Sequence, residues 1–395
     1  MKKITKILEE CKMATRYFFV PQINLLGAGC LNDFGPEVVG LGYKKALVVS
    51  DKVLDGLGIV AKVTDQLTAN GIEFVLFTET SENPTCAQVH GGHDLLKAEG
   101  CDFVVSVGGG SPQDCASAIA VLATNGGNIR DYEGIHMSKN PCLPVVAVNT
   151  TAGTSAEVTI NYVITDEDRG VKMVMVDKNS IAKMSVSDPE LMVGKPAALT
   201  AAVGVDLLTH AIECLVTPGA YAVSDPLALQ AVSIVFDYLP RAVKDGNDLE
   251  AREQLSYANF IVGLAFSNAG LGYVHAMAHQ LGGVYDLPHG VCNAMLLPVV
   301  QKENAKHVPE RFCLIANYLG FDCESATPVA CADFVIDKIV ALCEEVGIPK
   351  SLKELGIENP DLERLSDAAL LDVCAGGNPF MPTKEQTLEM FKAIV

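Results

Sequence analysis

The sequence predicts a chain of two domains, an α/β domain built on a parallel sheet followed by an all-α domain. Its 395 residues are more than one hydrophobic core usually accommodates, so two domains are expected. In the first half, short β-branched runs alternate with helical patterns, whereas long helical patterns dominate after about residue 196. The segment 187–196 contains two prolines and a glycine and is the expected boundary. We therefore expect an N-terminal extension at 1–15, the α/β domain at 16–194 and the helical domain at 195–395.

The α/β prediction depends on apolar runs that are too short to be helices. Strands are expected at 46–50, 74–77, 103–107 and 144–148. Helical patterns lie between or beside them at 59–69, 87–99 and 112–124. Strands that alternate with helices imply a parallel sheet covered on both faces, and such sheets bind ligands beyond the carboxyl ends of their strands.

Long helices are expected in the second half at 197–216, 225–242, 249–266, 273–281 and 330–346. The stretch 255–285 carries no Lys, Arg, Asp or Glu and resembles a membrane span in that respect. Its Asn, His, Ser and Gln side chains would be costly in hydrocarbon, so a buried helix near a site is expected instead.

The composition excludes some partners. The formal net charge is −19, from 29 basic and 48 acidic residues, and no Lys or Arg cluster offsets it. Because a phosphate backbone would repel such a surface, nucleic acid is not an expected partner. The thirteen cysteines are odd in number and none has C-x-x-C spacing, and no secretory signal is recognised. Reduced thiols in the cytoplasm are therefore expected.

The first sixteen residues carry an amphipathic pattern. Ile4, Ile7, Leu8 and Cys11 stand at i, i+3, i+4 and i+7, which predicts a short helix. Two interpretations remain open. The helix lies on the surface of the enzyme, or it is a peptide that docks on a partner such as the shell of a bacterial microcompartment.

A glycine-rich segment follows the third expected strand. The run Gly108-Gly109-Gly110-Ser111-Pro112-Gln113-Asp114 comes directly after the apolar stretch 101–107. Glycines let backbone amides approach a pyrophosphate, and a following helix supplies positive potential at its N-terminus. The serine is expected to cap that helix, with the proline in its first position. The alternative is a tight turn without a ligand.

The ribose-binding acid of the usual dinucleotide fingerprint is missing after these glycines. Asp51, at the carboxyl end of the first expected strand, is the best candidate instead. There it accepts hydrogen bonds from ribose hydroxyls, which would favour NAD over NADP, or it caps the next helix. The polar segment 150–159 follows the fourth strand and either lines a cofactor cleft or makes a polar turn.

Five metal-competent side chains gather in the second half. Asp206 and His210 stand at i and i+4, so they share one helical face. His275, His279 and His289 follow within the next eighty residues. A carboxylate with neutral imidazoles suits a divalent transition metal such as iron or zinc. Catalytic sites use three or four protein ligands, so at least one of the five has another role. Because His275 and His279 are also four apart, the spacing does not decide which.

The motifs together resemble one family. GGGSPQD at 108–114, TTAGTSAEVT at 150–159, GVDLLTHAIE at 204–213 and GLGYVHAMAHQLGGVYDLPHG at 270–290 are similar to the iron-containing (group III) alcohol dehydrogenases. The resemblance extends from about residue 16 to the C-terminus. Segments at 58–65, 157–167 and 372–379 are most similar to the lactaldehyde reductase branch, which interconverts lactaldehyde and 1,2-propanediol. The segment 188–202 is also similar to 1,3-propanediol and broad short-chain alcohol dehydrogenases.

The resemblance implies a dehydroquinate synthase-like fold, NAD(H) and Fe²⁺, with Zn²⁺ as the alternative ion. It implies a small aldehyde or alcohol as substrate and a homodimer or larger homo-oligomer. It assigns the iron ligands to Asp206, His210, His275 and His289. The residues expected to contact NAD are Asp51, Asn83, Gly108, Gly109, Gly110, Ser111, Asp114, Thr151, Thr154 and Lys172. The expected pocket walls are Asn161, Phe266 and Cys374. His279 is expected beside the nicotinamide and is the candidate proton relay.

Two departures from the family are visible. Residues 1–15 extend beyond its usual start, and Phe380 stands where the family often has an arginine. A zinc glycerol dehydrogenase, a lyase on the same fold and a non-catalytic shell-cargo or scaffold protein are the alternative functions.

Overall fold

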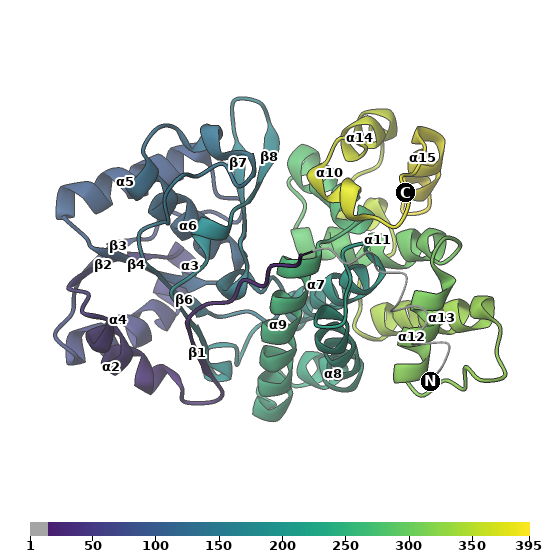
Figure 1. Cartoon of the computed structure of the whole chain (residues 1–395), viewed down its shortest axis with the longest axis horizontal. Helices are drawn as coiled ribbons and strands as arrows, with labels where there is room; N and C mark the ends of the chain where they lie inside the picture. Colours follow the sequence, from purple (N-terminus) through teal and green to yellow (C-terminus); the bar gives the residue numbers. More distant parts are fainter. Residues whose placement is uncertain (1–14) are drawn as a thin grey trace. The chain divides into compact units, whose positions relative to one another are not determined.

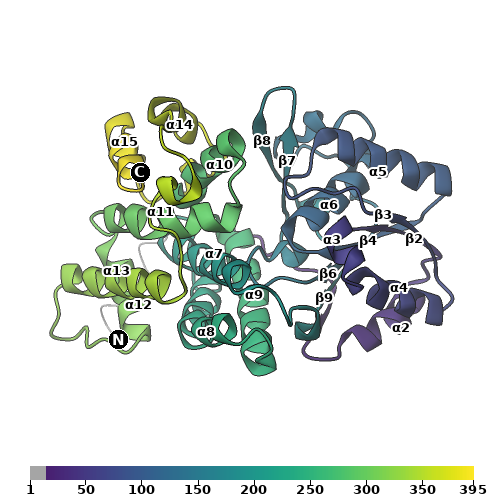
Figure 2. The same cartoon turned by 180° about the vertical axis from the view of Figure 1, so that it is seen from behind.

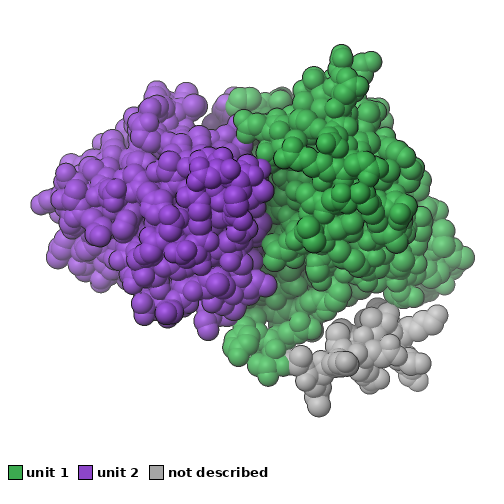
Figure 3. All heavy atoms as spheres, turned by 90° about the horizontal axis from the view of Figure 1, so that it is seen from above, with its two compact units in different colours: residues 1–18, 196–245, 264–395 green, residues 19–195, 246–263 purple. Residues whose placement is uncertain are grey.

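The computed structural model describes residues 15–395, so the helix expected near the N-terminus lies outside the described residues. Contacts within the chain divide it into two compact units (Figure 3). The α/β unit contains Phe19–Lys195 and Gly246–Gly263, and the helical unit contains Pro196–Asp245, Leu264–Val395 and the described residues up to Phe18. This differs from the expected division, which placed every residue from 195 onward in the second domain.

The α/β unit is built on a six-stranded sheet in which every pairing is parallel. The strand order is β1 (Ile23–Leu26), β9 (Met184–Ser187), β6 (Val145–Asn149), β4 (Phe103–Gly108), β2 (Lys45–Val49) and β3 (Glu73–Phe77). The four expected strands are present, each within one residue of its expected ends. The two strands β1 and β9 were not expected, because each has only four residues and polar residues interrupt its apolar side chains.

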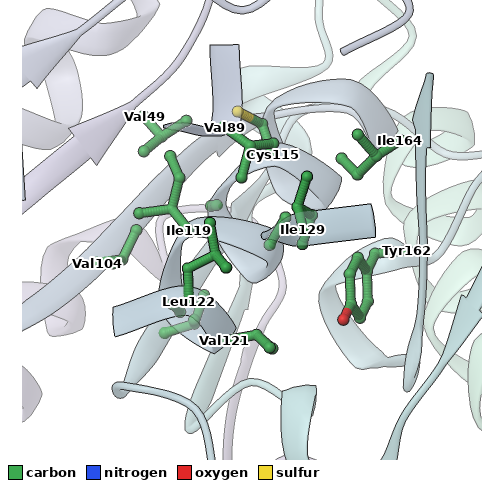
Figure 4. Close-up of a cluster of buried hydrophobic side chains, with 14 of the residues drawn as sticks. Val49, Val89, Val104, Cys115, Ile119, Val121, Leu122, Ile129, Tyr162 and Ile164 are labelled. Atoms are coloured by element: carbon green, nitrogen blue, oxygen red, sulfur yellow. The ribbon is translucent and has the colours of Figure 1, made fainter. Parts of the chain in front are cut away.

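Helices cover both faces of this sheet, and successive residues of each strand face opposite cores. Ala46 and Val48 pack with α2 (Leu31–Leu41) and α4 (Ile59–Ala69). On the other face, Leu47 and Val49 pack with α5 (Cys86–Glu99) and α6 (Gly110–Asn125) (Figure 1). Figure 4 shows α6 at the centre of this second core. The parallel sheet with helices on both faces is therefore confirmed.

A second, three-stranded sheet was not expected. It has the order β5 (Gly134–Ile135), β8 (Val171–Val176) and β7 (Asn161–Asp166). The last two form an antiparallel hairpin whose turn ends at Gly170, which has a left-handed φ of 63°. Along β7, buried and half-buried residues alternate, so the strand lacks the continuous apolar run that marked the others.

Every regular secondary-structure element in the described part of the helical unit is a helix (Figure 2). In order they are α7 (Ala197–Val216), α8 (Ser224–Lys244), the end of α9 (Leu249–Ala269), α10 (Tyr273–Tyr285), α11 (His289–Asn304), α12 (Pro309–Tyr318), α13 (Pro328–Glu345), α14 (Leu362–Ala369) and α15 (Lys384–Lys392). The bounds of α7 are those expected. Four helices were missed, among them α11, which carries Pro298 in its interior. The all-α class of this region is confirmed.

The helix α7 is buried almost throughout its length. By length and composition it could cross a membrane, yet 89% of its most apolar stretch is buried inside the protein. Other helices, not lipid, surround its apolar residues, so it serves as the central core helix of its unit.

Candidate functional site

Three of the five metal-competent side chains meet in the core of the helical unit. Asp206 and His210 come from successive turns of α7, and His275 comes from the first turn of α10. One ligand atom of each lies within 4.8 Å of the others, and all three residues are buried. The Nε2 atoms of His210 and His275 are 3.1 Å apart. One ligand atom from each of the three residues therefore converges on the same buried spot.

His289 approaches the same cluster from the start of α11. Its Nε2 atom lies 3.9 Å from Oδ1 of Asp206, and its ring centroid lies 5.4 Å from that of His275. The side chain keeps 31% of its surface exposed, whereas that of Asp206 keeps 1%. His289 thus closes the more open side of the cluster.

Asn293 lies one turn after His289 on α11 and was missed by the sequence analysis. Its Nδ2 atom donates to Oδ1 of Asp206 at 2.6 Å. The same atom lies 3.0 Å from Nε2 of His289 and 3.1 Å from Nε2 of His275. The i+4 spacing from His289 was the available signal. The amide holds the aspartate in place and lies among the imidazole nitrogens.

Glu213 was also missed, although it lies on the same face of α7 as Asp206 and His210. Its carboxylate accepts hydrogen bonds from the backbone N–H of Gly272 and of Val274 at 2.9 and 2.7 Å. Nδ1 of His275 lies 2.6 Å from its Oε2 atom. Burial raises the pKa of Glu213 to about 7, against the opposing effect of the backbone hydrogen bonds.

His279 belongs to a different group, with Asp372 and Cys374. Its Nδ1 atom lies 2.9 Å from Oδ2 of Asp372, and the backbone N–H of Cys374 donates to Oδ1 of the same carboxylate at 2.9 Å. Burial acts to raise the pKa of Asp372, but the charge and hydrogen bond of His279 and the hydrogen bonds of Cys374 together outweigh it, so the pKa lies below its usual value. The ring of His279 stacks on that of His289 at 5.5 Å. Asp372 was missed by the sequence analysis because it is far from His279 along the chain.

The three expected pocket residues are distributed over the two units. The ring of Phe266 stacks on that of His210, with centroids 4.3 Å apart. Cys374 joins the His279 group, whereas Asn161 begins β7 in the α/β unit. Phe380 stacks on the ring of His307 at 3.8 Å, so an aromatic contact occupies the position where the family often has an arginine.

The donor set fits a divalent transition metal. A carboxylate and imidazole nitrogens converge in a buried volume, and such groups are the ones that bind iron and zinc. Burial, together with the charges of His210 and His279, holds the pKa of His275 well below its usual value. The imidazole is therefore neutral, which is the form that binds a metal.

In the α/β unit, the glycine segment follows β4 at the carboxyl edge of the sheet. Gly108 has a left-handed φ of 156°. A Cβ added at Gly109 would lie 2.9 Å from Oγ1 of Thr151, and one at Gly110 would lie 3.1 Å from Cγ2 of Thr154. Only glycine lets the two loops approach this closely, so the glycine segment and the threonine segment form one surface.

The expected capping role of Ser111 is wrong. The helix α6 begins at Gly110, its N-cap is Gly109, and no side chain caps it. The extended backbone of Gly109 ends the turn two residues earlier than expected, and the hydroxyl of Ser111 donates to the carbonyl of Glu82 instead. The first amides of α6 are therefore not used by a cap, as a phosphate site requires. The bond also holds Glu82, and with it the adjacent Asn83, beside the glycine segment.

Asp51 caps the short helix α3 (Lys52–Gly56). Its Oδ1 atom accepts from the backbone N–H of Val53 and of Leu54, both at 2.8 Å. The structure thus shows the capping role of Asp51, one of the two roles considered for it. The residue follows β2, the neighbour of β4, so it shares the carboxyl edge of the sheet with the glycine segment.

Asp114 and Lys172, two further residues expected to contact the cofactor, interact electrostatically. Asp114, in α6, accepts from the backbone N–H of Val163 at 3.1 Å. Burial raises the pKa of Asp114 to about 8, and the charge of Lys172 acts in the opposite direction.

Asn259 fixes the threonine segment and was not expected to do so. Its Oδ1 atom accepts from the backbone N–H of Gly153 at 2.7 Å and of Ser155 at 3.1 Å. Its Nδ2 atom donates to Oε1 of the buried Glu157 at 2.8 Å. Ser155 has a left-handed φ of 54°, a conformation unusual for a residue with a side chain. These contacts show why residues 246–263 group with the α/β unit.

The chain matches known proteins over almost all of its length. Residues 21–189 match the family profile described as iron-containing alcohol dehydrogenase, and residues 200–395 match that of the C-terminal part of the Fe-containing alcohol dehydrogenase family. Alcohol dehydrogenase 4 of Schizosaccharomyces pombe is 45% identical over 383 residues, covering 96% of this chain and 89% of its own. NAD-dependent methanol dehydrogenase of Bacillus methanolicus is 42% identical over 375 residues, covering 95% and 98%.

Lactaldehyde reductase of Escherichia coli is 41% identical over 367 residues, covering 92% of this chain and 96% of its own. Among solved structures, that of a 1,3-propanediol oxidoreductase superposes with a TM-score of 0.93 at 42% identity, covering 96% of this chain and 99% of that one. The resemblance carried by the motifs is therefore confirmed, and it extends to several branches of one family at similar identity.

Proposed function

Because this chain belongs to the iron-containing alcohol dehydrogenase family and is an oxidoreductase acting on CH–OH groups, we propose that it interconverts lactaldehyde and 1,2-propanediol with NAD(H). The observation that carries this proposal is the convergence of a buried carboxylate and buried imidazoles in the helical unit. The α/β unit offers the glycine segment and uncapped helix that a dinucleotide needs.

We propose that the metal is held by Asp206, His210, His275 and His289. The contacts among the first three and the approach of His289 support this set. When bound, a divalent ion supplies Lewis-acid stabilisation of the negative charge that develops on the substrate oxygen. The protein's part is to hold the donors in a buried site, where Asn293 fixes the aspartate. Family membership names iron, and the ligands alone would also accept zinc.

We propose that NAD binds along the carboxyl edge of the sheet, with its pyrophosphate on the segment 108–111. The uncapped start of α6 and the close approach of Thr151 and Thr154 support this assignment. Asp51 contacts the ribose through the oxygen that does not cap α3, and its charge disfavours a 2′-phosphate. Further contacts are proposed for Asn83, Asp114 and Lys172.

His279 is proposed as the residue that passes a proton to or from the substrate oxygen. Its Nδ1 atom faces Asp372, so the opposite nitrogen, Nε2, is the one directed away from that carboxylate. The partnership with Asp372 fixes the orientation of the ring. A histidine held in this way can accept or donate a proton at Nε2 while its ring stays in one orientation.

The choice of a small three-carbon substrate rests on two observations. Phe266 stacks directly on His210 and Cys374 lies in the group with His279, so a bulky aromatic ring and a small apolar thiol stand beside the proposed metal ligand and proton-carrying residue. Both the 1,2-propanediol and the 1,3-propanediol enzymes are among the relatives. With Asn161 these residues are the proposed walls of the pocket. Oxidation of 1,3-propanediol is the second candidate, because the superposed structure is that of such an enzyme.

We further propose that the enzyme acts in the cytoplasm as a homodimer or larger assembly. The cysteines that the structure describes form no disulfide, and thiols stay reduced in a reducing compartment. Size-exclusion chromatography with light scattering tests the assembly. Deletion of residues 1–15 tests the docking role expected of that segment, by comparing copurification with a microcompartment shell.

A substrate panel tests the proposed function. NADH oxidation is followed at equal concentrations of lactaldehyde, 3-hydroxypropionaldehyde, acetaldehyde and formaldehyde, with enzyme reloaded anaerobically with Fe²⁺. The proposal expects the highest kcat/KM with lactaldehyde. A preference for 3-hydroxypropionaldehyde would favour the second candidate, and no reduction of any aldehyde would contradict both.

A further inference from the structure

We propose that Glu213 is a positioning residue of the metal centre, which fixes both the tautomer and the location of His275. The inference rests on the proposed metal site and adds a residue to it. Glu213 does not contact the proposed ion. It acts through the imidazole that does.

The carboxylate of Glu213 is enclosed by hydrogen-bond donors. Its side chain is fully buried, with 0% of its surface exposed. It accepts from two backbone amides, those of Gly272 and Val274, and lies 2.6 Å from Nδ1 of His275. Backbone amides can only donate, so both of them require the carboxylate to be an acceptor. In the third contact the carboxylate is also the acceptor when Nδ1 of His275 carries a proton and donates it.

This arrangement determines which nitrogen of His275 is available to a metal. A neutral imidazole carries one proton, and a proton on Nδ1 leaves a lone pair on Nε2. Nε2 is the atom that lies 3.1 Å from Nε2 of His210 in the ligand cluster. Carboxylate partners of this kind orient metal-bound histidines and make the ligating nitrogen more basic.

The same carboxylate fixes the start of the helix that carries His275. The N-cap of α10 is Gly272, which has no side chain with which to cap. Glu213 supplies the missing acceptor from α7, at the positive end of the α10 dipole. A Cβ at Gly272 would lie only 3.0 Å from Oε1 of Glu213, so the close approach depends on glycine. His275, the third residue of α10, is thus held in both position and rotation.

One helix therefore supplies two proposed ligands and the anchor of a third. Asp206, His210 and Glu213 occur at i, i+4 and i+7 on α7, which places all three on one helical face. Because α7 is buried almost throughout, its side chains have little freedom to move. We infer that this face preassembles the metal site before the ion arrives.

The test compares metal affinity in Glu213→Gln with that of the wild type. Glutamine has nearly the same shape, but its amide replaces one acceptor oxygen by an N–H donor. That donor would face another donor, either a backbone N–H of α10 or Nδ1–H of His275. Competition between the protein and a chelator for Zn²⁺ should show affinity lower by roughly 10- to 100-fold. The absorption bands of the Co²⁺-loaded protein should also shift. Neither readout depends on turnover.

Glu157→Gln is the matched control. Glu157 is also fully buried and hydrogen-bonded, but it belongs to the α/β unit and faces Asn149 and Asn259 rather than a histidine. Its substitution should leave Zn²⁺ affinity within threefold of wild type. An equal loss of affinity in both variants would mean that buried charge in general matters, and it would overturn the role given to Glu213.

The outcomes separate this inference from the proposed function. Wild-type protein that takes up no divalent ion would refute the proposed metal centre itself. Wild-type binding with unchanged affinity in Glu213→Gln would refute only the role of Glu213. If Glu213→Gln does not fold, Glu213→Asp replaces it, because aspartate keeps the acceptor but cannot reach both α10 and His275. A loss of at least fivefold is expected there, and unchanged affinity would overturn the inference.

Discussion

Two histidines one turn apart on α10 are each paired with a carboxylate, yet the two pairs differ in almost every other respect. Glu213, the partner of His275, comes from the buried helix α7 and also binds two backbone amides. Asp372, the partner of His279, precedes the short 3₁₀ helix η6 (Val373–Gly377) and adjoins Leu371, which is 87% exposed. The first pair is part of the core, and the second lies at its margin.

The pKa values of the two carboxyl groups shift in opposite directions. Burial raises the pKa of Glu213 to about 7, whereas the contacts of Asp372 with His279 and Cys374 together overcome the effect of burial and lower the pKa of Asp372. The same chemical pair therefore serves two purposes. A fully enclosed pair suits a ligand that must not move, and a pair at the margin suits a residue that exchanges protons.

Replacing His275 should have the largest effect. His275→Ala removes a proposed ligand, so the metal content should fall to near zero while the protein remains folded. Turnover should fall by about a thousandfold or more, because charge stabilisation of the transition state is lost. Metal analysis and NADH absorbance measure the two quantities on one preparation. A variant that keeps full activity would contradict the ligand assignment.

His279→Ala sharpens the contrast, since it should affect rate without affecting metal content. The expected loss in kcat/KM is roughly 100-fold, the scale of general acid–base catalysis by one residue. The dependence of the rate on pH should also change, because the proposed proton-carrying residue is lost. If metal content falls as far as it does in His275→Ala, the two pairs do not have the separate roles proposed.

Asp372→Asn should have a smaller effect that depends on pH. The folded-state pKa of Asp372 lies below its unfolded value, so its stabilising contribution is present above the unfolded pKa and is lost as pH falls through the folded pKa. The variant should be less stable than wild type by about 1 kcal/mol at pH 7. This difference should shrink toward zero near pH 3, as measured by urea unfolding. A difference that grows on acidification would reverse the assigned sign.

Glu157→Gln should have the smallest effect and tests whether burial alone raises a pKa as it does for Glu213. Burial raises the pKa of Glu157 to about 7, and no histidine hydrogen-bonds to it among the described residues. The folded protein therefore holds this proton more tightly, and stability is lost as pH rises from 4.5 through about 7. The melting temperature of the variant should change less than that of wild type between pH 5 and pH 8. Parallel curves would argue against burial as the cause.

Periodicity predicted the long elements and failed for the short or irregular ones. Ile59–Ala69 and Ala197–Val216 have the expected bounds because their apolar residues repeat without interruption. The strand Asn161–Asp166 escaped notice because only one face is fully buried. The helix His289–Asn304 was missed because Pro298 interrupts its pattern.

The candidate site was predictable in its residue types but not in its pairings. His275 and His279 are four residues apart, so the sequence does not distinguish them. Only the tertiary structure shows that His275 lies beside His210 and His279 beside Asp372. The carboxylate that accompanies each histidine is more than sixty residues away along the chain. No local pattern specifies such a partner.

The proposed activity requires one divalent ion bound by Asp206, His210, His275 and His289. Protein purified without oxygen should contain one equivalent of the ion per chain, and activity should disappear in proportion as a chelator removes it. Adding Fe²⁺ back should restore both metal content and activity. Metal-free protein that still reduces aldehydes at the full rate would contradict the proposed role of the metal centre.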